Sequence, residues 1–135
     1  MDMQSLDIFE GINAGVVEEI RNAGATMTFD AGTTIFENGT PASNLYILEQ
    51  GDIDLVSQTD DTSLNLNRPG DVFGWSCLVD KGVYTTTARV QSQTKVQCIA
   101  RADIDPIFDR NAKDALVLYK NLGNVFSKRM GSVVS

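Results

Sequence analysis

The chain has 135 residues, a hydrophobic content of 42% and a net charge of −7 at neutral pH. This length suffices for a single domain, residues 1–135, and no apolar run approaches the roughly 20 residues that span a membrane. The acidic balance argues against direct nucleic-acid binding, which depends on Lys and Arg neutralising phosphates. The N-terminus is acidic where a secretory signal would be basic, so we expect a cytoplasmic protein with no membrane association.

The sequence contains no histidine and two cysteines. Without histidine the commonest general base and the commonest metal ligand are both missing, so a Ser-His-Asp triad is excluded. Cys77 and Cys98 lack the close spacing of zinc ligands. We interpret both as buried free thiols, with a reactive Cys77 as the alternative. The expectation is a protein that is not an enzyme and uses no metal and no cofactor.

The first element is helical. Apolar residues recur at roughly helical spacing from Leu6 to Ile20, with polar residues between them. This pattern predicts a helix or helical pair over about residues 7–22, closed at Gly24. The N-terminal helical part therefore covers residues 7–24.

Residues 25–100 have the pattern of short strands separated by turns. An acidic hairpin tip is expected at residues 59–62. The clearest strand segments are Thr26–Phe29, Thr33–Glu37, Asn44–Gln50, 53–58, 64–67, 85–90 and Thr94–Ala100. About eight short strands at this spacing indicate an eight-stranded antiparallel jelly-roll barrel. The predicted fold class is therefore α+β, mainly β.

The helical period returns over residues 102–130. Two helices are expected, the second beginning after Asn111 as its cap. The wide apolar face of the second helix consists of Ala115, Leu118, Tyr119, Leu122, Val125 and Phe126. Two interpretations stay open: this face packs on its own barrel, or a second subunit covers part of it in a homodimer. Lys120, Lys128 and Arg129 are interpreted as solvated helix residues.

A concave segment lies between the last strands. The turn Pro69-Gly70-Asp71 leads to Gly74, a short helical turn over residues 76–80 and the strand Thr85–Val90. Backbone N–H groups at the start of such a turn point outward and attract an anion. The candidate ligand-binding residues are Phe73, Gly74, Trp75, Ser76, Cys77, Leu78, Tyr84, Thr85, Thr86, Thr87 and Ala88.

These elements together resemble the cyclic nucleotide-binding domain family. The framework motifs are Gly32, residues 37–48 around Leu45-Tyr46-Ile47-Leu48, Gly51 and the run Pro69–Gly74. The run Gly-Trp-Ser-x-Leu-Val from Gly74 is similar to single-domain bacterial members. The resemblance implies a regulatory signal-transduction module. In such a module, a ligand bound in the concave segment around Gly74, called the cradle below, shifts the C-terminal helices.

The phosphate-binding cassette departs from the family pattern. Family members carry a Glu after the cradle glycine, for the ribose hydroxyl, and an Arg further on, for the cyclic phosphate. Here those positions hold Trp75 and Thr86. Arg89 is expected to point to the opposite face of its strand, and Lys81 to lie in an exposed loop. Three outcomes stay open: Trp75 fills the pocket, the ligand has changed, or cyclic-nucleotide binding is retained.

The expected function is a non-enzymatic ligand-sensing module in which cyclic-nucleotide recognition is lost or changed. A small molecule, neutral or weakly anionic, is the expected ligand, held by hydroxyl groups and ring stacking. The alternative is a dimeric scaffold with a filled pocket. A cupin-type enzyme is disfavoured because cupins generally hold a metal through histidines. With the chain ending close after its last helix, we expect its output to pass through a partner or through dimerisation.

Overall fold

The computed structural model describes residues 2–57, 62–78 and 82–134. Its N-terminal part contains two short 3-10 turns and one α-helix: η1 (Met3–Ser5), η2 (Asp7–Phe9) and α1 (Ala14–Ala23). A curved antiparallel sheet follows, containing β1 (Ala25–Phe29), β2 (Thr34–Phe36), β3 (Asn44–Val56), β4 (Ser63–Leu66), β5 (Val72–Phe73) and β6 (Thr87–Ala100). A third 3-10 turn and two helices complete the described elements: η3 (Trp75–Leu78), α2 (Arg101–Arg110) and α3 (Ala112–Val134).

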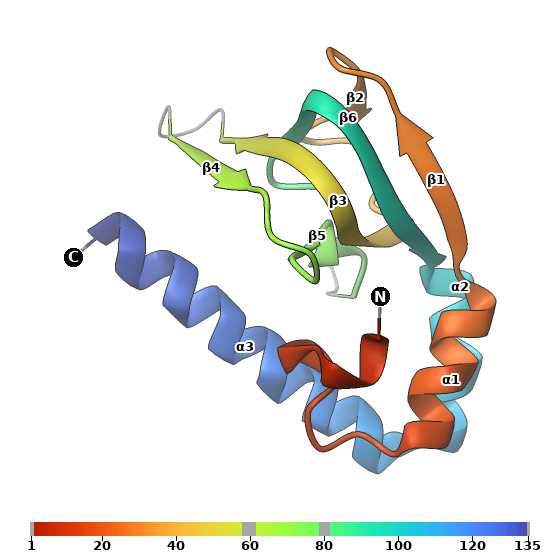
Figure 1. The fold of residues 1–135 in the computed structure, drawn as a ribbon. Helices are drawn as coiled ribbons and strands as arrows, with labels where there is room; N and C mark the ends of the chain where they lie inside the picture. Colours follow the sequence, from red (N-terminus) through yellow and green to blue (C-terminus); the bar gives the residue numbers. More distant parts are fainter. Residues whose placement is uncertain (1, 58–61, 79–81, 135) are drawn as a thin grey trace.

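The α+β class with helices before and after an antiparallel sheet is confirmed (Figure 1). The sheet has the order β1-β6-β3-β4, with β2 also paired to β6 and β5 to β3. The expected barrel segments appear in the described residues as six strands, because β3 and β6 each run through two of them. These two long strands pair from Asn44↔Ala100 to Val56↔Thr87. The hairpin tip expected at residues 59–62 lies almost wholly outside the described residues.

The continuity of β3 depends on its one glycine. The strand does not break at Gly51, as its sequence suggested, but bends there through register shifts against β6. Gly51 has a φ of +129°, and the Thr94 hydroxyl accepts a hydrogen bond from the backbone N–H of Asp52 at 3.1 Å. The bend thereby keeps both halves of β3 in one ladder.

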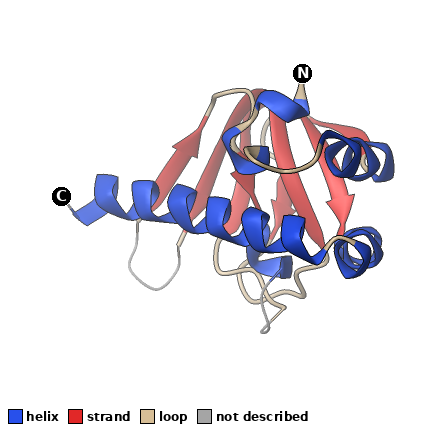
Figure 2. Ribbon diagram, turned by 90° about the horizontal axis from the view of Figure 1, so that it is seen from below, coloured by secondary structure: helices blue, strands red, loops and turns tan. Residues whose placement is uncertain are grey.

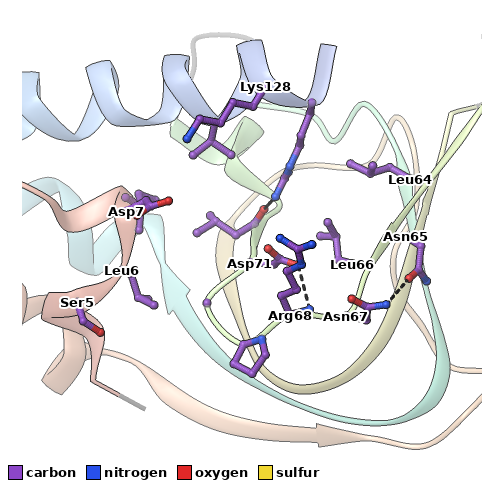
Figure 3. Close-up of a pocket in the computed structure, with 16 residues that line it drawn as sticks. Ser5, Leu6, Asp7, Leu64, Asn65, Leu66, Asn67, Arg68, Asp71 and Lys128 are labelled. Atoms are coloured by element: carbon purple, nitrogen blue, oxygen red, sulfur yellow. Dashed lines mark hydrogen bonds between the residues drawn. The ribbon is translucent and has the colours of Figure 1, made fainter. Parts of the chain in front are cut away.

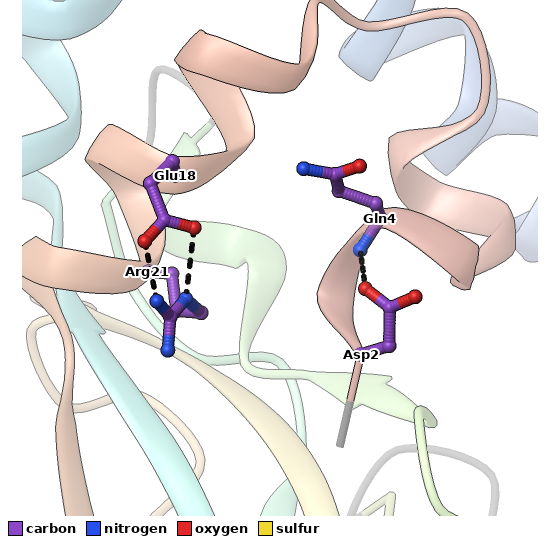
Figure 4. Close-up of polar contacts among 4 residues, drawn as sticks. All are labelled: Asp2, Gln4, Glu18 and Arg21. Atoms are coloured by element: carbon purple, nitrogen blue, oxygen red, sulfur yellow. Dashed lines mark hydrogen bonds and ion pairs between the residues drawn. The ribbon is translucent and has the colours of Figure 1, made fainter.

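The N-terminal helical pair is confirmed as η2 followed by α1. Asn13 caps α1, its side chain accepting a hydrogen bond from the Gly15 N–H at 2.8 Å. Asp2 likewise accepts from the Gln4 N–H at 3.1 Å, and Glu18 pairs with Arg21 on the solvent face of α1 (Figure 4). Arg21 lowers the pKa of the exposed Glu18, through a hydrogen bond first and its charge second. Such exposed pairs add little to the stability of the fold.

The long helix α3 crosses the open side of the sheet (Figures 1 and 2). Helices α1 and α2 lie together at one end of the sheet, and the N-terminal turns lie beside α3 (Figure 1). The Asn121 side chain joins these parts, donating hydrogen bonds to the carbonyls of Ile8 at 2.8 Å and Glu10 at 2.9 Å. The position of α3 is therefore tied to both the roll and the N-terminus. None of the described helices combines the length and the apolar character needed to cross a membrane.

Candidate ligand pocket

A glycine forms the sharp turn from β5 into η3. Gly74 has a φ of +74°, and a Cβ at this position would lie 3.0 Å from the Tyr46 ring and 3.2 Å from the Asn44 carbonyl oxygen. Any larger residue would therefore be strained as well as crowded. The predicted short helical turn is confirmed as η3, although it begins at Trp75; the part predicted over residues 79–80 lies outside the described chain.

A cavity of about 190 Å³ lies between this turn, the sheet and α3. Its walls combine aromatic rings, hydroxyl side chains and one guanidinium. The lining residues are Phe36, Leu55, Ser57, Thr62, Ser63, Leu64, Phe73, Gly74, Trp75, Ser76, Tyr84, Thr85, Thr86, Phe126 and Arg129. Residues from β2, β3, β4, η3 and α3 thus meet at one point, which their spacing along the sequence does not reveal.

Seven of the eleven predicted site residues line this cavity: Phe73, Gly74, Trp75, Ser76, Tyr84, Thr85 and Thr86. The other four do not line it, because they are buried beside it. Cys77, Leu78, Thr87 and Ala88 are at most 5% exposed. On β6, Thr87 also accepts a hydrogen bond from the Asn38 N–H at 3.0 Å. Neighbouring residues on a strand point to opposite faces, so the burial of both Thr87 and Ala88 means that both faces of β6 are covered at this end.

Trp75 borders the cavity without filling it. Its side chain is half-buried, with the Phe126 ring edge-on at a centroid distance of 6.2 Å. The Arg129 guanidinium lies over the Trp75 ring, 4.9 Å from its centroid. Open space therefore persists beside Trp75.

Arg129 is not a solvated helix residue, and that prediction was wrong. Its Nη2 donates to the Val72 carbonyl at 2.6 Å, and its side chain is half-buried. Burial lowers the pKa of this guanidinium, opposed by the charge of Asp71. Helical spacing places Phe126 and Arg129 on one face of α3, but it does not tell what that face covers. Lys120 and Lys128 are exposed, as predicted.

Of the two other cations considered for the cassette, the structure describes Arg89, which does not line the cavity. Arg89 is exposed, opposite Thr34 and Asp54 in the sheet, whereas Thr86 lines the cavity. The strand alternation that predicted opposite directions for these two side chains is consistent with this placement. Lys81 lies outside the described residues.

The apolar face predicted on α3 divides between the core and the surface. Leu118 and Leu122 are only 1% and 9% exposed within the single chain, so a second subunit could not cover them further. Ala115 and Val125 are partly buried, whereas Tyr119 and Phe126 are largely exposed. The Tyr119 hydroxyl donates to the Leu78 carbonyl at 3.0 Å, which ties α3 to η3.

A larger cavity of about 720 Å³ lies beside the first and shares Arg129 as a wall (Figure 3). It is formed by the N-terminal turns, the β4–β5 connection and α3. Its rim carries charges of both signs, from Asp7, Arg68, Asp71 and Lys128. Within the described part of the chain, no group of three or more acidic or cysteine side chains is arranged to hold a metal ion.

The two thiols differ in accessibility. Cys77 is fully buried, and burial raises its pKa to about 11, whereas Cys98 is half-buried. The neutral thiol of Cys77 is therefore favoured, which contradicts the reactive alternative.

We expect a Cys98→Ser protein, which keeps only Cys77, to react with DTNB at pH 8 at least about 100-fold more slowly when native than in urea. With a pKa of about 11, about one in a thousand Cys77 side chains is a thiolate at pH 8. The sulfur is also buried in the core. The Cys77→Ser protein, which keeps Cys98, is the matched control and should react faster. Equal native and unfolded rates for Cys77 would contradict the expectation.

The fold and the cradle define a class of protein, and comparison with known proteins supplies the family. The family model described as "Cyclic nucleotide-binding domain" matches residues 26–111. The chain therefore belongs to the cyclic nucleotide-binding domain family, and its fold is the family's regulatory fold.

Two of the similar proteins are named as regulators. A cAMP-dependent protein kinase regulatory subunit from Pyricularia oryzae is 22% identical, over 84% of this chain and 31% of its own length. A CRP-like cAMP-activated global transcriptional regulator from Mycobacterium tuberculosis is 26% identical, over 70% of this chain and 43% of its own length. This chain thus spans less than half the length of either relative.

A solved structure has a similar fold along nearly its whole length. It is a putative cyclic nucleotide-binding protein from Geobacter metallireducens, 24% identical with a TM-score of 0.82, and the match covers 95% of both chains. At this level of identity the likeness concerns the fold alone.

Proposed function

We propose that this chain is a non-enzymatic regulatory domain that senses a small molecule other than a cyclic nucleotide. The observation that carries the proposal is the open cavity of about 190 Å³ beside Trp75. A pocket filled by the tryptophan would favour the alternative, a scaffold without a ligand. The coexistence of a void and an altered lining favours a changed ligand.

The altered lining disfavours cyclic nucleotides on two grounds. The charged pair that reads ribose and phosphate in the family is replaced by Trp75 and Thr86, both of which line the cavity. Hydrogen bonds to charged groups contribute about 1.5–3 kcal/mol each, so losing two weakens binding by about two to four decades if they add. The cavity is also smaller than the roughly 300 Å³ at which sites for drug-sized ligands begin.

The C-terminal helix is the element that would respond to a ligand. Phe126 and Arg129 of α3 form part of the cavity wall, and Tyr119 bonds the turn that carries Trp75. A ligand in contact with both α3 and the roll changes the balance between open and closed positions by its differential affinity for them. Asn121 would pass such movement to the N-terminal turns.

Dimerisation through α3 remains part of the proposal, using residues other than the buried leucines. Leu116 is 70% exposed, and with Tyr119, Gly123 and Phe126 it follows the alternating three- and four-residue spacing of a coiled-coil seam. A homodimer seated on this seam would adjoin the ligand pocket at Phe126. In the alternative function, this seam would be the working surface of a scaffold whose pocket stays empty.

We expect cAMP and cGMP to give no saturable thermal shift of the full chain at millimolar concentration. A ligand at 100 times its Kd adds about 2.7 kcal/mol, which moves the Tm of a domain this size by several degrees. A cAMP-binding domain with the family's Glu and Arg, titrated in parallel, is the positive control. A saturable shift with either nucleotide would overturn the proposal that recognition has changed.

A further inference from the structure

Aromatic rings form a large part of the cavity wall. Phe36 and Tyr84 stack with their centroids 3.8 Å apart, and Phe73 lies 6.1 Å from Phe36. Trp75 and Phe126 complete the set of five rings that line the cavity. Such a wall favours a flat, unsaturated ligand, because ring faces and edges pack against one another at these distances.

Among the described residues that line the cavity, Arg129 is the charged side chain, and Asp71 of the neighbouring cavity acts on the same guanidinium. Arg129 brings a guanidinium to the cavity, and no carboxylate of the described residues lines it. The remaining polar wall consists of hydroxyl side chains, among them Ser63, Ser76, Thr85 and Thr86, which can donate as well as accept. A planar guanidinium matches the geometry of a carboxylate, and hydrogen bonds between charged partners are the strong ones.

The size of the cavity favours a compact ligand. About 190 Å³ corresponds to about six water molecules at their liquid volume of about 30 Å³ each. That space suits a molecule of a single small ring with one anionic group. A nucleotide, with a base, a sugar and a phosphate, would have to extend beyond it.

We propose that the pocket binds a compact aromatic or unsaturated carboxylate, with its ring among the aromatic side chains and its carboxylate on Arg129. This inference rests on the proposed sensing function and names its ligand class. Because Arg129 belongs to α3 while Tyr84, Ser76 and Thr86 belong to the roll and its connections, the carboxylate would bridge the two. The negative charge of the ligand would thereby hold α3 against the roll.

Trp75, the only tryptophan of the chain, allows a direct test. The full-length protein is titrated with sodium benzoate, and Trp75 fluorescence is followed. Benzamide, a neutral compound of similar shape, is titrated in the same way. We expect saturable binding of benzoate and binding of benzamide that is about 10- to 100-fold weaker.

Variants of α3 test the role of the guanidinium. Arg129→Gln should weaken benzoate binding about 10- to 100-fold while leaving benzamide binding little changed. Lys128→Gln removes the same charge from the neighbouring exposed residue, which lines the other cavity, and should bind benzoate like the unaltered protein. Thermal unfolding checks that both variants are folded.

Equal binding of benzoate and benzamide, or no benzoate binding up to about 10 mM, would overturn the assignment of the ligand class without any variant. Benzoate affinity that is unchanged in a folded Arg129→Gln protein would also overturn it. These failures are distinguishable from failure of the proposed function, which a saturable shift with cAMP or cGMP would reveal.

Discussion

Replacing Gly51 by alanine should lower the free energy of unfolding by about 2–5 kcal/mol. Two costs combine at this position. A φ of +129° is unfavourable for any residue with a Cβ, by about 1–2 kcal/mol. The added Cβ would also lie 2.2 Å from the Thr94 Oγ1 and 2.7 Å from the Thr94 Cα, and overpacking of this kind costs about 1–3 kcal/mol.

Gly39→Ala is the matched control for this substitution. Gly39 also has a positive φ, of +85°, but an added Cβ would have nothing within 4 Å, so only the conformational cost of about 1–2 kcal/mol applies. Urea unfolding followed by Trp75 fluorescence measures both variants. Adding Thr94→Ala to Gly51→Ala should not restore stability, because the contact with the Thr94 Cα remains. Equal losses in the Gly51 and Gly39 variants would contradict the explanation.

Phe73→Ala should destabilise the protein by about 3–5 kcal/mol. Phe73 is 1% exposed and packs between aromatic rings. Its ring centroid lies 5.2 Å from that of Tyr46 and 6.1 Å from that of Phe36. Removing it costs the transfer free energy of the ring and leaves a void next to the existing cavity. The surrounding sheet cannot collapse freely into this space, because Val72 and Phe73 are held by pairing of β5 with β3.

The same substitution at Phe126 provides the comparison. Phe126 lines the same cavity but is 51% exposed, so Phe126→Ala should cost about 1 kcal/mol or less. Urea unfolding of the two variants gives the difference. Similar losses at both positions would show that Phe126 is buried in solution, which would place a second subunit or another segment over it.

Local patterns account for most of the elements that the sequence predicted. The alternation in the predicted strands and the helical spacing before Gly24 depend only on which side of an element faces the core. Local patterns did not show that two predicted strand segments join to form β3, or that two others join to form β6. Gly51 is typical of a turn, and only pairing with β6 shows that the chain bends there and continues.

The candidate site was likewise predictable only in part. Trp75 and its neighbours were found because they are contiguous around one glycine. Arg129 was missed because its role depends on the direction in which α3 crosses the sheet, about fifty residues further along the chain. A lysine or arginine on a helix is usually solvated, and no local pattern distinguishes the one that lies over a tryptophan.

By itself, the sequence determined the family and the class of fold, and it predicted that Trp75 and Thr86 stand where the family's cassette carries charge, because these follow from residue types in a fixed order. The tertiary structure decided that Trp75 leaves a cavity open, that Arg129 brings a positive charge to it, and that Leu118 and Leu122 are buried against their own domain. Each of these depends on the packing of α3 against the roll. Such packing is set by the shapes of side chains distant in sequence, which residue order alone does not specify.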